Sequence, residues 1–333
     1  MKGGPVPRVR SIDAFRGLGI MLMVLFTLMA RLSFPPDQLQ HNVPDSVHIG
    51  DFVLPMFLFA SGMSLVFFRR KREGKDAGAY ALDVAERFGA LVLVSFLLSP
   101  FSAGSPFGMD EVMLNALLFL PCALMLALPD AALAAVMAAV AALYLGLASL
   151  HALPDFSAAY LGGYPAAVFW LPVMLGGVLA GRRVAEGRQY AALIAVFAIA
   201  AVALAALVPP WKMSASPSFM AFAMTVSLLF YYIIDRSVKR AGWKDGEGAG
   251  PVEHAGMKPI RYWVLMFVLV AIPVDFYSLF ARTGEPLGAD WRVAALFSLL
   301  CLPLLCLASE CIDRLPPLAG LFGGNAGKRG LKN

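Results

Sequence analysis

The chain has 333 residues, of which 59% are hydrophobic and only 15% charged, and its mean hydropathy is +0.73. A soluble domain of this size holds far fewer apolar residues, so the composition excludes one and predicts a polytopic membrane protein. The net charge of +5 requires no nucleic-acid partner, because basic loops on one side of a membrane account for it.

Apolar stretches long enough to cross a bilayer recur along the sequence. About 20 helical residues span a hydrocarbon core of roughly 30 Å. Ten such spans are predicted, near residues 14–32, 50–68, 84–100, 109–128, 131–150, 164–181, 190–209, 217–234, 262–280 and 293–309. The expected fold class is all-α, a single membrane domain over residues 1–333. Its helices one to eight lie within 12–235, a linker follows at 236–260, helices nine and ten lie within 261–310, and a tail occupies 311–333.

Basic residues are distributed unequally between the two sides of these spans. Of the 27 Lys and Arg residues, 23 fall on the side of the N-terminus. The four on the other side are Arg31, Lys212, Arg282 and Arg292. Because cytoplasmic loops carry the excess of positive charge, both termini are predicted to be cytoplasmic. The same basic loops are expected to contact anionic lipid headgroups.

The first predicted span opens with the polar residues Ser11, Asp13 and Arg16. Asp13 and Arg16 are three residues apart, so on a helix they share one face and can pair. Ser11 can cap the same helix. One interpretation is a capped, ion-paired helix start. The other has Arg16 facing an anionic cytoplasmic ligand, which a guanidinium binds in fork geometry.

The loop between the first two spans contains two histidines and three carboxylates, but no Lys or Arg. These residues are Asp37, His41, Asp45, His48 and Asp51. A histidine beside a carboxylate suits general-base catalysis, because its pKa lies near neutrality and the carboxylate fixes its tautomer. Solvated histidines or a surface metal site are the alternatives. The spacing matches no metal motif, so no metal is expected.

Three later features complete the pattern. Within the linker 236–260, residues 242–251 are polar and rich in glycine, as expected of a flexible cytoplasmic segment. The ninth span contains Asp275 after Pro273, and a helix break at the proline would let Asp275 line a cavity or pair internally. The four cysteines are interpreted as small buried apolar residues.

Two stretches resemble the heparan-α-glucosaminide N-acetyltransferase-like family of membrane acyltransferases. They are residues 12–24 (IDAFRGLGIMLMV) and residues 50–64 (GDFVLPMFLFASGMS). In that family a first helix with a D-x-F-R-G pattern is followed by an outer histidine, ten residues before the aspartate that opens the second pattern. The same count back from Asp51 selects His41 over His48. Residues 160–183 also look like the family's sixth helix.

Two departures from the family bear on sugar specificity more than on the reaction class. Thr27 stands where the family commonly has an asparagine late in the first helix. A hydroxyl cannot present the carbonyl and the amide of asparagine together. Residues 107–115 (FGMDEVMLN) also lack the arginines of the family's R-x-x-G-V-L-Q-R-like string.

The resemblance implies transfer of an acyl group, most simply acetyl, from cytoplasmic acetyl-CoA to an amine or hydroxyl of a sugar or glycan on the outer face. It implies that His41 is the general base or a transient acyl carrier and that Asp51 orients it. Thr27, His48 and Asp275 are the expected acceptor-side residues. The candidates on the CoA side are Asp13, Arg16, Arg87, Arg182, Arg183 and Arg261.

Two other functions stay open from the residues alone. A secondary transporter or flippase for a sugar or lipid-linked substrate would use Asp51 and Asp275 as coupling sites, and the third alternative is a non-catalytic membrane scaffold. The compact frame lacks the long luminal extension of the animal enzymes, so a prokaryotic inner membrane is expected. The oligomeric state is left open, with a homodimer as one alternative.

Overall fold

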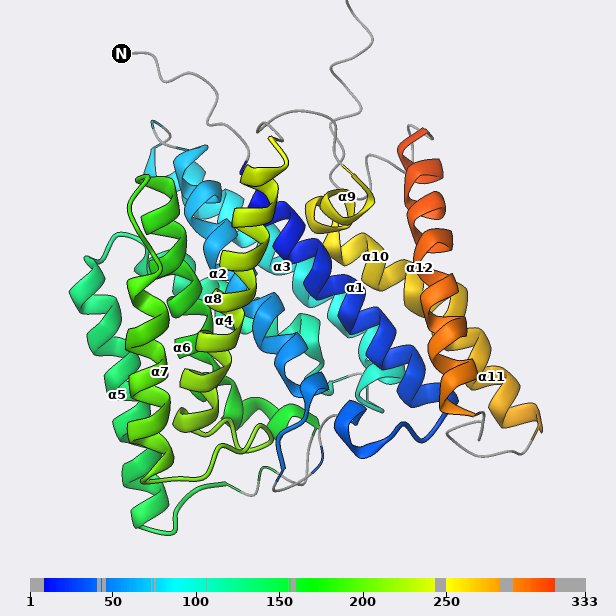
Figure 1. The fold of residues 1–333 in the computed structure, drawn as a ribbon, viewed down its shortest axis with the longest axis horizontal. Helices are drawn as coiled ribbons and strands as arrows, with labels where there is room; N and C mark the ends of the chain where they lie inside the picture. The colour runs from blue at the N-terminus through cyan, green and yellow to red at the C-terminus, as the bar shows by residue number, and fades with distance from the viewer. Residues whose placement is uncertain are drawn as a thin grey trace, which may run out of the picture.

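The computed structural model describes residues 9–40, 43, 46–72, 74, 76–105, 107–154, 156, 160–242, 250–281 and 290–314. The regular structure in these ranges is helical, without strands, so the all-α prediction is confirmed. Figure 1 shows the helices packed as one bundle.

The described elements are all helical. The first half comprises α1 (Arg10–Leu32), η1 (Asp37–Leu39), η2 (Ile49–Phe52), α2 (Val53–Arg70), α3 (Ala77–Ser102), α4 (Glu111–Met125) and α5 (Asp130–Ser149). The second half comprises η4 (Tyr160–Gly162), α6 (Gly163–Ala185), α7 (Ala192–Ala205), α8 (Pro217–Arg240), α9 (Pro251–Met257), α10 (Pro259–Met266), η5 (Phe267–Ala271), α11 (Ile272–Ala281) and α12 (Trp291–Arg314).

Seven helical segments are long and apolar enough to cross a membrane, among the residues that the structure describes. They are α1, η2 with α2, α5, α6, α8, the run from α10 to α11, and α12. The helices α4 and α7 are apolar but shorter. Helix α3 is long but carries Asp83, Glu86 and Arg87 in its first half. A count of ten crossings depends on these last three helices.

Helices α2 and α6 form the centre of the bundle and pack unusually close together. A Cβ atom at Gly62 would overlap the carbonyl of Met174, and one at Gly177 would overlap the carbonyl of Phe59. Small residues at a helix interface let two backbones approach in this way. Helices α1, α4 and α8 pack around this central pair.

Part of the predicted linker 236–260 is helical. Helix α8 continues to Arg240, and α9 occupies Pro251–Met257. Helix α9 lies against the start of α1, where Gly17 and Gly256 leave room for backbone contact. Residues 243–249 of the linker lie outside the described part of the chain. Within the predicted linker, residues 251–257 are therefore an ordered helix packed on α1.

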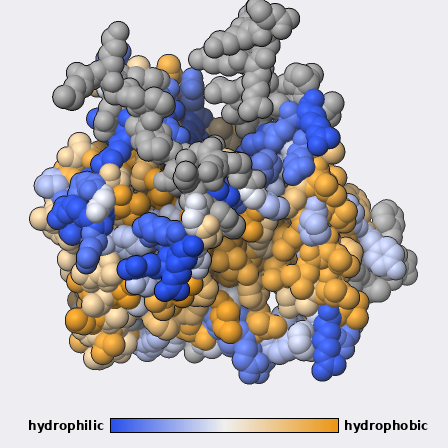
Figure 2. Space-filling view, turned by 45° about the horizontal axis from the view of Figure 1, so that its top comes forward, coloured by the Kyte–Doolittle hydropathy of each residue, from blue (hydrophilic) through white to orange (hydrophobic). Residues whose placement is uncertain are grey.

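Basic residues gather at one end of the bundle. Helix α1 begins at this end, which is uppermost in Figure 1, and α2, α6, α8 and α12 finish there. The cations near it include Arg10, Arg16, Arg69, Arg70, Lys71, Arg72, Arg182, Arg183, Lys239, Arg240, Lys258 and Arg314. At the opposite end lie Arg31, Lys212 and Arg292, within the described ranges. Hydrophobic side chains cover much of the flank between the ends (Figure 2).

The ninth predicted span is irregular near Pro273. A π-helical turn, Phe267–Ala271, separates α10 from α11 just before the proline. The missing N–H of proline explains why the regular helical ladder is interrupted there. Such π-turns often occur at functional sites, and Phe267 lines a cavity next to Asp275.

Candidate active site

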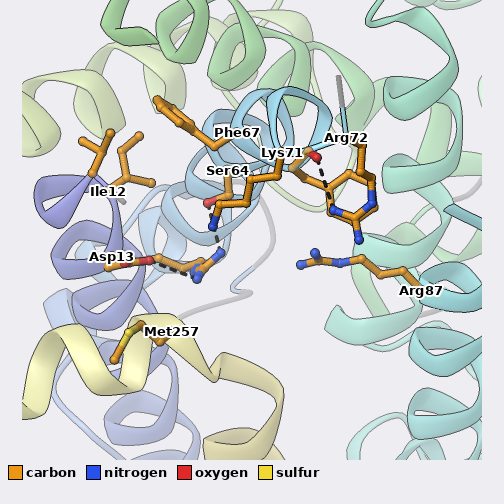
Figure 3. A pocket seen from close by; sticks show the side chains of 11 residues that line it. Ile12, Asp13, Ser64, Phe67, Lys71, Arg72, Arg87 and Met257 are labelled. Atoms are coloured by element: carbon orange, nitrogen blue, oxygen red, sulfur yellow. Dashed lines mark hydrogen bonds and ion pairs between the residues drawn. The ribbon is translucent and has the colours of Figure 1, made fainter. Parts of the chain in front are cut away.

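A cavity of about 280 Å³ lies at the basic end of the bundle, between α1, α2 and α3. It is lined by Val9, Ile12, Asp13, Arg16, Ser64, Phe67, Phe68, Lys71, Arg72, Arg87 and Met257. Figure 3 shows the charged ends of Lys71, Arg72 and Arg87 around one space that Asp13 and Ser64 also face. Because this lining, called the basic cavity below, holds four cations and one carboxylate, it is electropositive.

Arg16 crosses from α1 to two neighbouring helices. Its Nη1 donates to Ser64 Oγ at 3.0 Å and its Nη2 donates to Asp13 Oδ1 at 3.3 Å. Its Nε donates to the carbonyl of Gly256 in α9. The two interpretations of the helix start are therefore compatible, since Arg16 pairs with Asp13 and still lines the basic cavity.

Two more guanidinium groups complete the charge of the basic cavity. Arg72 pairs with Asp83 of α3, and its Cζ lies 3.6 Å from the ring centroid of Phe68. Arg87 lies close enough to Arg16 and Arg72 to be repelled by both. Like charges held together in this way favour binding of an anion such as a phosphate.

The structure brings together only some of the residues that the sequence predicted for the CoA side. Asp13, Arg16 and Arg87 share the basic cavity. Arg182 instead donates to Asp130 Oδ1 at 2.7 Å and to the carbonyl of Leu126, and Arg183 lies 3.9 Å from the same carboxylate. These two arginines connect α6 with α4 and α5 and do not line the basic cavity.

Three polar residues of the basic cavity were not selected from the sequence, and a further selected arginine lies outside that cavity. Lys71 and Arg72 were counted only as topology signals, and their position directly after the second span, opposite the start of the first, was the available clue. Ser64 gave no signal beyond the family pattern. Arg261 is 2% exposed and donates to Asp313 Oδ1 at 2.7 Å, so it holds α10 against α12.

A second cavity, of about 530 Å³, lies at the opposite end of α1. It is lined by Thr27, Ala30, Arg31, Pro100, Phe101, Ser102, Gly104, Glu111, Trp263, Phe267 and Asp275. Arg31 forms an ion pair with Asp275 and also donates to the carbonyl of Phe101. Asp275 thus both pairs internally and lines a cavity, which is called the polar cavity below.

Asp51 is fully buried and sits at the entrance of α2. Its Oδ1 accepts from Lys212 Nζ at 3.1 Å, and its Oδ2 accepts from the backbone N–H of His48 at 2.8 Å. The ring Nδ1 of His48 lies 3.8 Å from the same carboxylate. Burial lowers the pKa of Lys212, while the charges of Asp51 and Glu111 favour its protonated form. His41 lies outside the described residues, so its pairing with Asp51 stays a prediction.

Lys212 is the most consequential residue that sequence reasoning missed at this end. It lies between α7 and α8, where it was counted only as one of four cations on the outer side. It is 4% exposed. Few lysines are so fully buried without a partner, but no sequence pattern connects residue 212 with residue 51.

A third, small cavity of about 10 Å³, called the constriction below, is lined by α1 residues that lie between those of the two larger cavities. It is lined by Ile20, Met23, Phe57, Leu91, Glu111, Val112, Asn115, Pro259, Ile260 and Trp263. Glu111 and Trp263 also line the polar cavity. On α1, positions 13 and 16 line the basic cavity, positions 20 and 23 line the constriction, and positions 27 and 30 line the polar cavity. These positions follow helical spacing, so one face of α1 lines all three spaces.

Among the described residues, no group of three or more His, Cys, Asp or Glu side chains is arranged to hold a metal ion. Cys122 and Cys301 are buried, as expected, whereas Cys306 is partly exposed and Cys311 is exposed.

The comparison with known families agrees with these features. The family model described as heparan-alpha-glucosaminide N-acetyltransferase, catalytic, matches residues 8–233, which is more than half of the chain. No curated protein matches the sequence. The match and the seven apolar helices identify an integral membrane protein of an acetyltransferase family. The resemblance noted in residues 12–64 is thus confirmed, and the chain belongs to the heparan-alpha-glucosaminide N-acetyltransferase catalytic family.

Proposed function

We propose that this protein transfers an acetyl group from cytoplasmic acetyl-CoA to an amine or hydroxyl of a sugar or glycan on the outer face of the membrane. Membership of the family supplies the reaction class. The observation that carries the rest is that one face of α1 lines a basic cavity, a constriction and a polar cavity in succession. That order fits a donor whose phosphates bind at one end and a sugar acceptor that binds at the other.

The proposed orientation places the basic end of the bundle in the cytoplasm. Support comes from the positive-inside rule, because the cations gather at the end where α1 begins and α12 finishes. With α3, α4 and α7 included, the chain crosses the membrane ten times and both termini are cytoplasmic. A prokaryotic inner membrane is the proposed location.

On the donor side, the guanidinium groups of Arg16, Arg72 and Arg87 bind the phosphates of CoA. Fork-shaped donors suit phosphate oxygens, and Asp13 and Ser64 hold Arg16 in place. The pantetheine arm then extends along α1 toward Ile20 and Met23, which line the constriction. The phosphates stay at the wet, basic end while the thioester enters a drier region.

On the acceptor side, the polar cavity binds the sugar. The carboxylate of Asp275 and the hydroxyl groups of Thr27 and Ser102 are suited to its hydroxyl groups. In the proposed reaction, His41 takes the proton of the attacking amine or hydroxyl. Asp51 orients His41 in this reaction, and the backbone N–H of His48 donates to the Asp51 carboxylate at the start of α2.

The test is an acetyl-transfer assay with the purified protein in detergent, radiolabelled acetyl-CoA and a panel of amino sugars. The wild-type protein should label an acceptor, and His41→Ala should abolish labelling while the protein still inserts and elutes as a folded species. Near-normal turnover in His41→Ala contradicts the assigned base. Transport of an unmodified sugar into proteoliposomes, without acetyl transfer, would identify a transporter instead.

A further inference from the structure

The constriction contains two buried polar groups that lack partners in the described part of the chain. Trp263 is 2% exposed and its Nε1–H donates no hydrogen bond. Asn115 is 9% exposed and its Oδ1 accepts none. Most buried polar groups in native proteins are paired, so an unpaired donor and an unpaired acceptor in one lining point to a missing ligand.

The surroundings of these groups indicate what kind of ligand fits. The other lining side chains are apolar except Glu111, and they include Ile20, Met23 and Phe57. The space of about 10 Å³ holds only one water-sized group, such as a single carbonyl oxygen. A small group with one hydrogen-bond acceptor, entering through an apolar ring, satisfies Trp263. A thioester carbonyl has this chemistry.

We infer that the constriction is the point of acyl transfer, where the Nε1–H of Trp263 binds the oxygen of the acyl carbonyl and Asn115 Oδ1 accepts from the attacking acceptor group. This inference rests on the proposed function. Trp263 stabilises the negative charge that develops on the carbonyl oxygen. Asn115 orients an attacking amine, because its Oδ1 binds the N–H hydrogen that the base does not take.

The transfer step conserves atoms and charge. The acceptor nitrogen or oxygen forms a bond to the carbonyl carbon, and the carbon–sulfur bond breaks. The proton of the acceptor passes to the base, His41 in the proposed reaction. CoA leaves as a thiolate toward the basic cavity, where solvent protonates it, and the acetylated sugar remains in the polar cavity.

Trp263→Phe tests the role of the indole N–H, and the chain offers a matched control. Trp170 is also fully buried with an unpaired Nε1, but it lines none of the three spaces. Loss of a single oxyanion donor lowers kcat by about 100-fold. Trp263→Phe should show a loss of that order with little change in the KM for acetyl-CoA. Trp170→Phe should leave kcat close to that of the wild type, because Trp170 lies outside the lining.

An infrared measurement separates a hydrogen bond to the carbonyl from a general loss of packing. Acetyl-CoA labelled with carbon-13 at the carbonyl, bound without acceptor, should show a carbonyl stretch at lower frequency in wild type than in Trp263→Phe. Trp170→Phe should match wild type. An unchanged band in Trp263→Phe, or an unchanged kcat, overturns the role of Trp263.

A second variant, Asn115→Leu, replaces the amide by an apolar side chain of similar size. It tests the inference independently if Trp263→Phe does not fold. It should lower kcat at least tenfold, with the carbonyl band at the wild-type frequency. Wild-type kcat in Asn115→Leu overturns the role of Asn115. Absence of acetyl transfer by the wild-type protein is a different result, because it contradicts the proposed function itself.

Discussion

Arg87 shows how a charged residue within a predicted span acquires a role from its neighbours. On the sequence it is one of several arginines near the cytoplasmic face. In the structure it meets Arg16 and Arg72 in one cavity. Mutual repulsion makes an unoccupied cluster of this kind unfavourable, and a bound phosphate relieves it.

Arg87→Ala should therefore weaken acetyl-CoA binding. Loss of a hydrogen bond to a charged group amounts to about 1.5–3 kcal/mol, so the KM for acetyl-CoA should rise by roughly 10- to 100-fold. Arg240→Ala is the control, because Arg240 is exposed at the same end but outside the cavity. The KM of each variant, measured at low and high salt, checks the prediction. An equal KM in the two variants contradicts it.

The buried pair of Asp51 and Lys212 gives a prediction about stability. Lys212→Met removes the cation and leaves the carboxylate of Asp51 buried without its charge partner. Breaking a buried pair on one side destabilises a protein by about 3–5 kcal/mol. The variant should lose thermal stability in detergent. The double variant Asp51→Asn with Lys212→Met should recover much of that loss, and equal melting temperatures for the single and double variants would count against the pair.

At the scale of helices, the contact between α1 and α9 is the main addition to the sequence-based fold. A seven-residue helix with Gly, Glu and His is too short and too polar to produce an apolar period. Its stability comes from contact with α1, including the ion pair between Arg10 and Glu253. By contrast, length and hydropathy predicted the long helices well, because those properties are local.

Gly17→Ala should disturb this contact. A methyl group at Gly17 would overlap the backbone carbonyl of Val252, so α9 must shift, and the shift disturbs the hydrogen bond from Arg16 to the carbonyl of Gly256. The expected results are a lower melting temperature and a higher KM for acetyl-CoA. Gly89→Ala is the matched control, because a Cβ there meets no atom within 4 Å. In an exposed helix position this change stabilises by about 1 kcal/mol. Similar melting curves for the two variants would show that α9 packs loosely.

The three spaces along α1 mark the limit of what the sequence predicts. The α1 side of each space is readable, since Asp13, Arg16 and Thr27 were selected from the first helix alone. In the constriction, the residues that face α1 come from α2, α3, α4 and α10, and only tertiary packing brings Asn115 and Trp263 into one lining. Sequence reasoning therefore identified the donor end in part and missed the constriction entirely.

For the whole molecule, the proposed donor and acceptor sites depend on how the bundle is oriented in the membrane. Ala152, just beyond α5, and Arg240, at the end of α8, are both exposed and lie at opposite ends of the bundle. Helices α6, α7 and α8 run between them. If all three helices cross the membrane, the two residues lie on opposite sides. If α7 does not cross it, they lie on the same side.

Cysteine labelling in intact cells checks this orientation. In a background with the four native cysteines replaced by alanine, Ala152→Cys should react with a membrane-impermeant maleimide. Arg240→Cys should react only after the cells are permeabilised, because the basic end is expected in the cytoplasm. The reverse pattern would exchange the donor and acceptor sides and contradict the proposed direction of transfer. If both variants are labelled from outside, α7 does not cross the membrane, and the predicted count of ten crossings is wrong.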